Sequence, residues 1–347
     1  MRKKVLHNRI NRDELKRQMA ESSEERITLS FYKYYHILNP NFFRDYMYYE
    51  WSDLGILGRI YIANEGVNGQ ISLPKANLEL FKTKMAEVSF FEKLRLNIAI
   101  DDDGKSFFKL IVKVRKKIVA DGLDDASFDV TDRGTHVNAQ EFNQLTNEED
   151  SILIDMRNHY ETEVGHFQGA ILPDADTFRE LLPQVIEEYK DAKGKKVIMY
   201  CTGGIRCEKA SAYFKHNGFE NVFQLDGGII EYTRQVEKQG LENKFKGKNF
   251  VFDERLGERI SEEIISECHQ CGKPCDTHIN CANDACHLLF LQCEECKTEH
   301  ESCCSAQCQN FNNLDEEEQK EKKKTEVFNG TKFGKARYRV HKHGHLK

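Results

Sequence analysis

The twelve cysteines of this 347-residue chain are confined to one region. All of them lie between Cys201 and Cys308, and ten lie between Cys268 and Cys308. Secreted disulfide proteins distribute their cysteines through the fold, whereas metal-binding segments concentrate them. The distribution therefore predicts reduced thiols that bind a metal or act as nucleophiles.

Two Cys-x2-Cys pairs give this cluster the spacing of a zinc ribbon. Cys268 and Cys271 form the first pair, and Cys293 and Cys296 form the second. Each turn presents two thiolates from one loop, so the four residues predict a tetrahedral, structural zinc site. The ligands of a second site remain open among the following residues: Cys275, Cys281, Cys286, Cys303, Cys304, Cys308 and His278. An iron–sulfur cluster is the alternative, and in either case the segment should fold only with its metal bound.

The length of the chain predicts two or three domains, because one hydrophobic core rarely serves so many residues. Its basic start is not followed by an apolar run, and no apolar stretch reaches the roughly 18 residues of a membrane-spanning helix. We therefore expect a soluble, cytoplasmic protein with no membrane partner. The net charge of −6 leaves the partner open, since local basic patches matter more than the total.

The first part of the chain, residues 27–120, has the pattern of a ferredoxin-like domain. Strands are predicted at residues 27–36, 55–63, 69–73, 94–100 and 107–119, and helices at residues 40–51 and 77–88. The order β-α-β-β-α-β predicts an α+β sandwich, with one layer of helices on an antiparallel sheet.

A basic stripe follows the last of these predicted strands. Its members share one face of the strand at period two: Lys109, Lys113, Arg115 and Lys117. Such a stripe is either a solvated strand face or a track for the phosphates of a nucleic acid. We take these four residues as candidate RNA contacts.

The central part, residues 135–240, predicts an α/β domain with a parallel sheet. Residues 151–155 and 196–200 are short apolar strands bounded by polar residues, as buried parallel strands should be. Predicted helices at residues 177–189 and 208–217 accompany them. Beyond the cysteine-rich segment at residues 263–311, residues 312–347 have the composition of a charged, disordered tail.

One loop of the central part has the pattern of a nucleophile site. Cys201 stands directly after a predicted strand and directly before a helix. Gly203 and Gly204 let the backbone turn its N–H groups inward, and the helix N-terminus adds positive potential. Both effects favour the thiolate of Cys201, and Arg206 closes the loop with a fixed cation. We predict Cys201 and Arg206 as the catalytic residues.

This loop resembles that of the rhodanese family. From Cys201 to Arg206 the pattern is Cys-x4-Arg, one residue shorter than the Cys-x5-Arg loop of cysteine phosphatases. The likeness extends to residues 155–170 and to the run Leu225-Asp-Gly-Gly228. It implies a rhodanese-like domain whose cysteine carries a persulfide, as in a sulfurtransferase. Polar residues of the first segment are interpreted as scaffold rather than as catalysts: Asp155, Arg157 and His166.

Residues 27–311 together are similar to the bacterial tRNA uridine hydroxylase family. The likeness rests on the basic stripe, the Cys201 loop, the cysteine cluster and two further runs: Ile62-Ala-Asn-Glu-Gly-Val-Asn-Gly-Gln-Ile-Ser and Lys116-Lys-Ile-Val-Ala-Asp-Gly-Leu. The resemblance implies hydroxylation of uridine 34 of tRNA, the wobble position, to 5-hydroxyuridine. It further implies dioxygen as co-substrate, the anticodon loop of tRNA as partner and an essential Cys201.

The sequence contains neither a metal triad for oxygen activation nor a dinucleotide-binding fingerprint, so we expect no nucleotide cofactor. Our hypothesis is that the Cys201 thiolate adds to C6 of uracil and leaves electron density at C5 for dioxygen or a derived peroxide. Cys207 is either a reductant or resolving thiol, or a small residue packed under the first helical turn. The electron donor stays open.

Two other functions compete with hydroxylation. A rhodanese-type sulfurtransferase would pass persulfide sulfur from Cys201 to an acceptor. An RNA-binding adaptor with an inactive rhodanese module is disfavoured, because Cys201 and Arg206 are both present.

Overall fold

The computed structural model describes residues 11–123, 128–330 and 337–338. Parts of the sequence for which predictions were made lie outside this description: residues 1–10, 124–127, 331–336 and 339–347. Among the described residues, no helix has the length and apolar character needed to cross a membrane.

The chain divides into two compact units. Unit 1 comprises Met1–Leu153, Glu188–Asn243 and Phe252–Arg255, and unit 2 comprises the remainder: Ile154–Glu187, Lys244–Val251 and Leu256–Lys347. Unit 1 thus holds both the predicted N-terminal sandwich and the Cys201 loop, and unit 2 holds the cysteine-rich segment.

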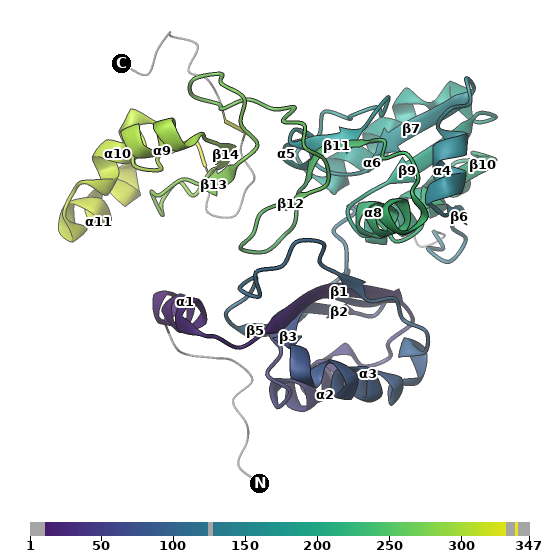
Figure 1. Ribbon diagram of the computed structural model, residues 1–347, viewed down its shortest axis with the longest axis horizontal. Coiled ribbons are helices and arrows are strands. Elements are labelled where there is room, and N and C mark those ends of the chain that lie inside the picture. The colour runs from purple at the N-terminus through teal and green to yellow at the C-terminus, as the bar shows by residue number, and fades with distance from the viewer. Residues whose placement is uncertain (1–10, 124–127, 331–336, 339–347) are drawn as a thin grey trace. The chain divides into compact units, whose positions relative to one another are not determined.

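The N-terminal part of unit 1 is a sheet with helices on one face (Figure 1). Its elements are α1 (Arg12–Glu21), β1 (Arg26–Tyr34), α2 (Pro40–Ser52), β2 (Leu57–Ala63), β3 (Gly66–Pro74), α3 (Leu78–Ala86), β4 (Asn97–Ile98) and β5 (Leu110–Val114), with 3-10 turns at Lys75–Asn77 and Ser89–Phe91. The strand order is β4-β1-β3-β2-β5. Its first four members have the order of the predicted ferredoxin-like sandwich, which is thereby confirmed.

Strand β5 departs from the prediction. It pairs with β2 in parallel, so the sheet is mixed and not wholly antiparallel. The reason is the long connection after β4, which carries the chain from one edge of the sheet to the other. The strand also ends at Val114, so the period-two alternation that would align the predicted basic stripe does not continue to Lys117.

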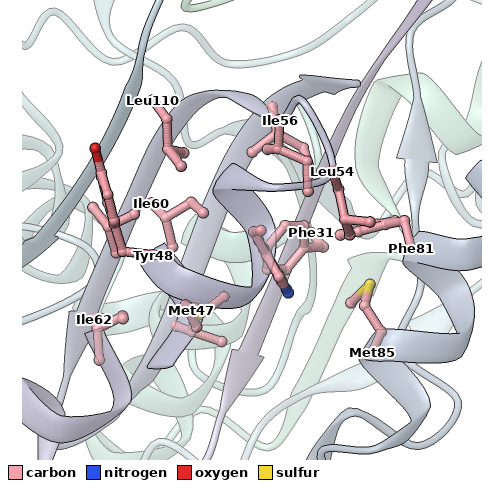
Figure 2. Packing of buried hydrophobic residues seen from close by; sticks show 14 of the residues in the cluster. Phe31, Met47, Tyr48, Leu54, Ile56, Ile60, Ile62, Phe81, Met85 and Leu110 are labelled. Carbon is pink, nitrogen blue, oxygen red and sulfur yellow. The ribbon is translucent and has the colours of Figure 1, made fainter. Parts of the chain in front are cut away.

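The core of this sandwich lies between the sheet and helices α2 and α3 (Figure 2). Helix α2 contributes Met47 and Tyr48, and α3 contributes Phe81 and Met85. The Trp51 ring meets Phe81 edge to face at 5.0 Å, an arrangement that aromatic pairs favour. The strand residues packed against them include Leu29, Phe31, Ile60, Ile62 and Leu110. Because Leu29 and Phe31 point into this core, Ser30, Tyr32 and Tyr34 of β1 lie on the opposite face of the sheet.

The Cys201 part of unit 1 is built on a parallel sheet, as predicted. Its elements are β6 (Thr135–Val137), α4 (Ala139–Leu145), β7 (Ser151–Asp155, whose last two residues belong to unit 2), the 3-10 turn Lys190–Ala192, β9 (Lys196–Tyr200), α7 (Ile205–His216), β10 (Asn221–Leu225) and α8 (Gly228–Gln239). The strand order is β6-β10-β9-β7, and β10 pairs in parallel with both β6 and β9. The strands β7 and β9 match the predicted residues at both ends, since polar residues bound each apolar run.

Unit 2 contains small sheets and short helices. Its elements are α5 (His159–Thr162), β8 (Gly165–Phe167), most of α6 (Phe178–Glu188), β11 (Phe245–Asn249), β12 (Glu258–Arg259), β13 (His278–Asn280), β14 (Leu289–Leu291), α9 (Glu294–Glu299), α10 (Ala306–Asn312) and α11 (Glu316–Thr325). Strands β12-β11-β8 form one sheet and the antiparallel pair β13-β14 another.

Helix α11 (Glu316–Thr325) lies within residues 312–347, for which a disordered tail was predicted, and corrects that prediction for its own residues. Asp315 caps the helix by accepting hydrogen bonds from the N–H groups of Glu317 and Glu318. Acidic residues occupy its first turn and lysines its last, which complements the helix dipole at both ends. The charged composition that predicts a disordered segment is therefore equally compatible with a capped helix that is polar on all sides.

Candidate active site

The loop after β9 encloses the sulfur of Cys201. Its side chain is fully buried, and its Sγ accepts a hydrogen bond from the Gly204 N–H at 3.1 Å. Gly204 has φ of 96°, and a Cβ at this position would lie 2.7 Å from the Tyr32 hydroxyl. Glycine is therefore required there, both for the turn and for the close approach of Tyr32.

The start of helix α8 fixes the other side of the loop. The N–H groups of Ile229 and Ile230 donate to the carbonyl oxygens of Cys201 and Thr202, at 3.0 and 3.2 Å. Gly228 permits this contact, since a Cβ there would lie 2.4 Å from the Cys201 oxygen. The carbonyl oxygens of the loop therefore accept hydrogen bonds from α8, on one side, while the Gly204 N–H points to the sulfur.

The surroundings of Cys201 favour its thiolate. Burial alone would raise the pKa of Cys201, but the Cys207 thiol, the charge of Arg206 and the N–H groups of both residues together lower this pKa to about 6. The Arg206 guanidinium is nearly buried, donates to Thr202 Oγ1 at 3.3 Å and lies 5.8 Å from the centre of the Phe252 ring. The two predicted catalytic residues therefore lie close together, Cys201 in the loop and Arg206 in the first turn of α7, and the structure places the buried Cys207 beside the sulfur.

The open face of the N-terminal sheet covers this loop. Tyr34 donates its hydroxyl to the Ile205 carbonyl oxygen at 3.3 Å, and Asn97 donates its amide to the Gly203 oxygen at 3.3 Å. The Tyr32 hydroxyl donates to Glu208 at 3.1 Å. Burial, followed by the charges of Glu208 and Cys201, raises the pKa of Tyr32, so this phenol stays protonated. Sequence reasoning missed these residues, although their alternation with Leu29 and Phe31 places Tyr32 and Tyr34 off the core.

Glu208, in the first turn of α7, is a buried carboxylate with several partners. Besides Tyr32, it contacts His136 Nε2 at 2.9 Å and Arg133 at 3.0 Å. Burial would raise the pKa of Glu208, but these partners, with His136 foremost, lower it. A negative charge is thus held within the region that surrounds the Cys201 loop.

Lys209, the next residue of α7, brings together two runs on which the family resemblance rests. Its ammonium group, almost fully buried, lies 2.8 Å from Glu65 of the β2–β3 turn and also contacts Asp121. Burial would raise the pKa of Asp121, but hydrogen bonds from Lys117 and Lys209 lower it. Glu65 also accepts the Ile118 N–H at 2.6 Å. The two N-terminal runs therefore tie the sandwich to the helix that follows Cys201.

The variant Lys209→Met should destabilise the protein by about 3–5 kcal/mol, because it leaves the carboxylates of Glu65 and Asp121 close together without their cation. Denaturant unfolding measures this loss. Lys215→Met is the matched control on the same helix, since Lys215 pairs with Asp132 at the surface and should contribute no more than about 1 kcal/mol. Equal losses in the two variants would contradict the structural role of Lys209.

The predicted basic stripe is divided in the structure. Lys113 is exposed on β5, Arg115 lies beyond the strand with its guanidinium 5.3 Å from the centre of the Tyr61 ring, and Lys117 pairs with Asp121 at 2.7 Å. Lys109 is half-buried just before the strand. Lys117 thus belongs to the Lys209 network, and a role of the stripe in RNA binding stays a prediction.

A cavity of about 440 Å³ lies beside the Cys201 loop. Its lining comes from β1, from the segment before and within β4, from the residues preceding β6, and from Glu208 and Asp226. Asn97 and Tyr32, which contact Gly203 and Glu208, belong to this lining. The cavity is therefore adjacent to the loop that holds the reactive sulfur.

The predicted zinc ligands come together in unit 2. The sulfur atoms of Cys268, Cys271, Cys293 and Cys296 all lie within 4.8 Å of one another. Cys271 and Cys293 are 3.6 Å apart. Sulfurs bonded to one tetrahedral zinc at 2.3 Å would be about 3.8 Å apart. The spacing fits a single metal ion, because a cluster of several irons would separate its cysteine ligands further.

A second set of four cysteines has the same geometry, and it identifies the second site, whose ligands the sequence spacing left open. Its members are Cys281, Cys286, Cys304 and Cys308, all buried. The sulfur of Cys304 lies 3.6 Å from that of Cys286 and 3.7 Å from that of Cys308. In each set a cysteine N–H donates to the first sulfur, Cys293 to Cys268 and Cys304 to Cys281, both at 3.4 Å. Cys275, Cys303 and His278 belong to neither set.

Residues interpreted as scaffold make structural contacts in unit 2. The fully buried Arg157 donates to Asp155 at 2.7 Å and to the Gly165 carbonyl oxygen at 2.6 Å. His166 Nδ1 lies 2.9 Å from the Thr162 oxygen. These contacts agree with the scaffold interpretation.

Comparisons with known proteins cover almost the whole chain. Family profiles match three consecutive segments: the UPF0176 acylphosphatase like domain at residues 26–118, the Rhodanese-like domain at residues 138–235 and the Rhodanase C-terminal segment at residues 246–309. A protein named tRNA uridine(34) hydroxylase from Photorhabdus laumondii is 55% identical over 338 residues, 97% of this chain and 96% of that protein. A protein of the same name from Escherichia coli (strain SE11) is 56% identical over 305 residues, 88% of this chain and 87% of that protein. This chain therefore belongs to the tRNA uridine(34) hydroxylase family.

Proposed function

We propose that this protein hydroxylates uridine 34 of tRNA to 5-hydroxyuridine, with Cys201 as nucleophile and dioxygen as co-substrate. The observation that carries the proposal is the 55% identity to a protein named for this reaction, over nearly the full length of both chains. The reaction consumes one dioxygen, two electrons and two protons, and releases 5-hydroxyuridine and water. The two electrons come from an unidentified donor, and the reaction takes place in the cytoplasm.

The Cys201 loop supports a mechanism of covalent activation. The thiolate forms a bond to C6 of uracil, and the electron pair of the C5–C6 double bond moves towards C5 and the C4 carbonyl. The two electrons and two protons from the donor convert dioxygen to a peroxide, and the electron pair at C5 attacks one of its oxygens. The C5–O bond forms, the O–O bond breaks, and the second oxygen leaves as hydroxide, which takes up the C5 proton to become water. Loss of the C5 proton and departure of the sulfur then restore the double bond. Inward N–H groups such as that of Gly204 stabilise the sulfur anion before attack and after release.

A tRNA carrying 5-fluorouridine at position 34 tests the covalent step. In this nucleotide a fluorine atom occupies the place of the C5 hydrogen. After addition at C6 and oxidation at C5 there is no C5 proton to lose, so the sulfur cannot depart and the enzyme stays bound. We expect a covalent protein–tRNA complex, detected by denaturing gel and by mass spectrometry of the Cys201 peptide. Its absence under turnover conditions would count against addition of Cys201 to C6.

Sulfur transfer is the second candidate, because a low-pKa cysteine in a Cys-x4-Arg loop also suits a persulfide. The two functions have different products. Hydroxylation adds one oxygen atom to a tRNA nucleoside, whereas sulfur transfer releases thiocyanate when thiosulfate and cyanide are supplied. Nucleoside mass spectrometry and a thiocyanate assay on the same preparation distinguish them.

The two cysteine sets act as structural metal sites in this proposal. Their eight thiols offer all-sulfur, four-ligand coordination, which is the donor set that structural zinc favours. Such a metal would hold α9, α10 and the β13-β14 pair together and would leave no open position for a substrate.

The activity should depend on pH through Cys201. Its pKa of about 6 means that the thiolate predominates above pH 6 and that protonation removes it below. We expect kcat/KM for tRNA to fall about tenfold per pH unit below pH 6. In Arg206→Met the loss of the guanidinium charge should raise the midpoint, and Arg206→Lys should shift it less. A midpoint near the ordinary thiol value in the unaltered protein would contradict the assigned role of the loop.

A further inference from the structure

One hydroxyl group of the N-terminal sheet lies against the loop that holds the reactive sulfur. The Gly204 N–H donates to the Cys201 sulfur at 3.1 Å, and a Cβ on the same glycine would lie 2.7 Å from the Tyr32 hydroxyl. Tyr34, on the same face of β1, donates its hydroxyl to a backbone carbonyl oxygen. The Tyr32 hydroxyl instead donates to a carboxylate, that of Glu208. A titratable hydroxyl with a charged partner therefore lies beside the loop that holds the sulfur.

Glu208 holds this hydroxyl in place. The carboxylate is almost fully buried, accepts the Tyr32 hydroxyl at 3.1 Å, and also contacts His136 at 2.9 Å and Arg133 at 3.0 Å. Because the last two partners remain, the carboxylate stays fixed when the phenol hydrogen turns to another acceptor. Tyr32 and Glu208 both line the cavity of about 440 Å³, which has room for peroxide to enter and for water to leave.

The charges around Tyr32 make its hydroxyl a proton donor to strong bases only. Burial, followed by the charges of Glu208 and Cys201, raises the pKa of Tyr32. The phenol therefore keeps its proton until a strong base forms beside it, and a departing hydroxide is such a base. For the same reason the phenolate, once formed, readily takes up the next available proton. The group can thus give and recover a proton within one reaction cycle.

The proposed reaction contains a proton transfer that needs such a group. The electron pair at C5 attacks one oxygen of the peroxide, and the second oxygen departs in line with the new C5–O bond, on the side away from C5. The new hydroxyl group then stands between the C5 proton and the departing hydroxide. A side chain that gives one proton and takes the other bridges this separation, and general acid–base groups contribute about 10²–10⁴-fold to reaction rates.

We propose that Tyr32 is a catalytic residue that carries this proton, and that Glu208 is its positioning residue. As the O–O bond breaks, the phenol gives its proton to the departing hydroxide, which leaves as water. The phenolate then takes the C5 proton, the electrons of that C–H bond form the C5–C6 double bond, and those of the C6–S bond return to sulfur. Tyr32 and the Cys201 thiolate are thereby restored. This inference rests on the proposed function, and its test separates the failure of the two.

The assay uses the full-length protein, unmodified tRNA and hydrogen peroxide under single-turnover conditions. Peroxide supplies the oxygen atom and the two electrons together, so that uridine and hydrogen peroxide give 5-hydroxyuridine and water without a donor. Mass spectrometry of nucleosides gives the rate at saturating protein and the protein concentration at half of that rate. Peroxide is kept at a level at which mass spectrometry finds the Cys201 peptide unoxidised.

Tyr32→Phe keeps the ring and removes only the hydroxyl. We expect the rate at saturating protein to fall at least about 10²-fold, with the half-saturating concentration within about twofold of that of the unaltered protein. Tyr232→Phe is the matched control, because it removes a phenol hydroxyl that donates to Asn143 at 2.9 Å and to the Glu242 carbonyl oxygen at 3.2 Å. It loses hydrogen bonds of the fold and should keep the rate within about twofold.

Glu208→Gln tests the positioning role. It keeps the size of the side chain and an oxygen that can accept the hydroxyl but removes the charge, so the rate should fall about tenfold, less than in Tyr32→Phe. Because Glu208 acts through Tyr32, the double variant should be no slower than Tyr32→Phe alone. Independent roles would instead multiply the two losses.

Several results would overturn the proposal. Equal rates in Tyr32→Phe and Tyr232→Phe would exclude the hydroxyl from the reaction. A higher half-saturating concentration with an unchanged rate would make Tyr32 a binding residue only. Multiplied losses in the double variant would show that Glu208 does not act through Tyr32. In each of these cases the unaltered protein still forms 5-hydroxyuridine, whereas if it forms none, the proposed function fails together with the proton transfer.

Discussion

Replacing Cys201 by serine should reduce the formation of 5-hydroxyuridine at least about 10³-fold, because the reaction loses its nucleophile. The sulfur is fully buried, and its pKa of about 6 makes it an anion at neutral pH. A serine hydroxyl remains protonated in the same ring of N–H groups and cannot attack C6. Mass spectrometry of nucleosides from tRNA incubated with the variant measures the loss.

The fold should survive this substitution, which separates loss of chemistry from loss of structure. Serine has nearly the same shape, and its oxygen can accept the Gly204 N–H that the sulfur now accepts. Cys207→Ala provides the comparison: it removes one thiol hydrogen bond to the sulfur, worth about 0.5–1.5 kcal/mol, and should raise the pH midpoint by about one unit or less. Undiminished product in Cys201→Ser would end the proposal of a sulfur nucleophile.

The Cys201 loop could be predicted from the sequence because its determinants are local. A strand, two glycines, an arginine and a helix follow one another within a few residues, and the structure places them as the order implies. The same holds for β7 and β9, whose ends are set by adjacent polar residues. The cysteine pairs around Cys268 and Cys293 are local as well.

The surroundings of the loop could not be predicted, because they depend on contacts between distant residues. Tyr32 and Glu208 are 176 positions apart, and Lys209 and Glu65 are 144 positions apart. No periodicity in the sequence links such pairs. The mixed sheet has a related cause, since a parallel β5 depends on where a long connection crosses and not on the residues of the strand. Helix α11 was missed for another reason. Its capping residue Asp315 can be recognised in the sequence, but the charged composition of the segment favoured a prediction of disorder.

Removing the metal should unfold the cysteine-rich segment while the Cys201 loop keeps its structure. Among the described residues, the buried cluster around the second set consists of its four cysteines, Cys303 and only four other apolar residues: Leu288, Phe290, Phe311 and Phe328. So small a core cannot offset the loss of coordination, which contributes about 10–16 kcal/mol in small zinc domains. After chelation under mild denaturation, we expect hydrogen exchange to lose its protection over residues 268–311 but to keep it in β9 and α7.

Single cysteine variants show which thiols hold the metal. The unaltered protein should contain two zinc ions per chain, one for each set of four sulfurs. Cys271→Ser and Cys286→Ser should each lower the content to about one, because a three-thiol site binds zinc more weakly and admits water. Cys275→Ser and Cys303→Ser are the matched controls and should keep both ions, since their sulfurs belong to neither set. If the metal-free protein kept full protection of this segment from hydrogen exchange, the structural role of the metal would be refuted. If the purified protein contained iron and inorganic sulfide instead of zinc, the sites would hold iron–sulfur clusters, contrary to the 3.6 Å distance between sulfur atoms.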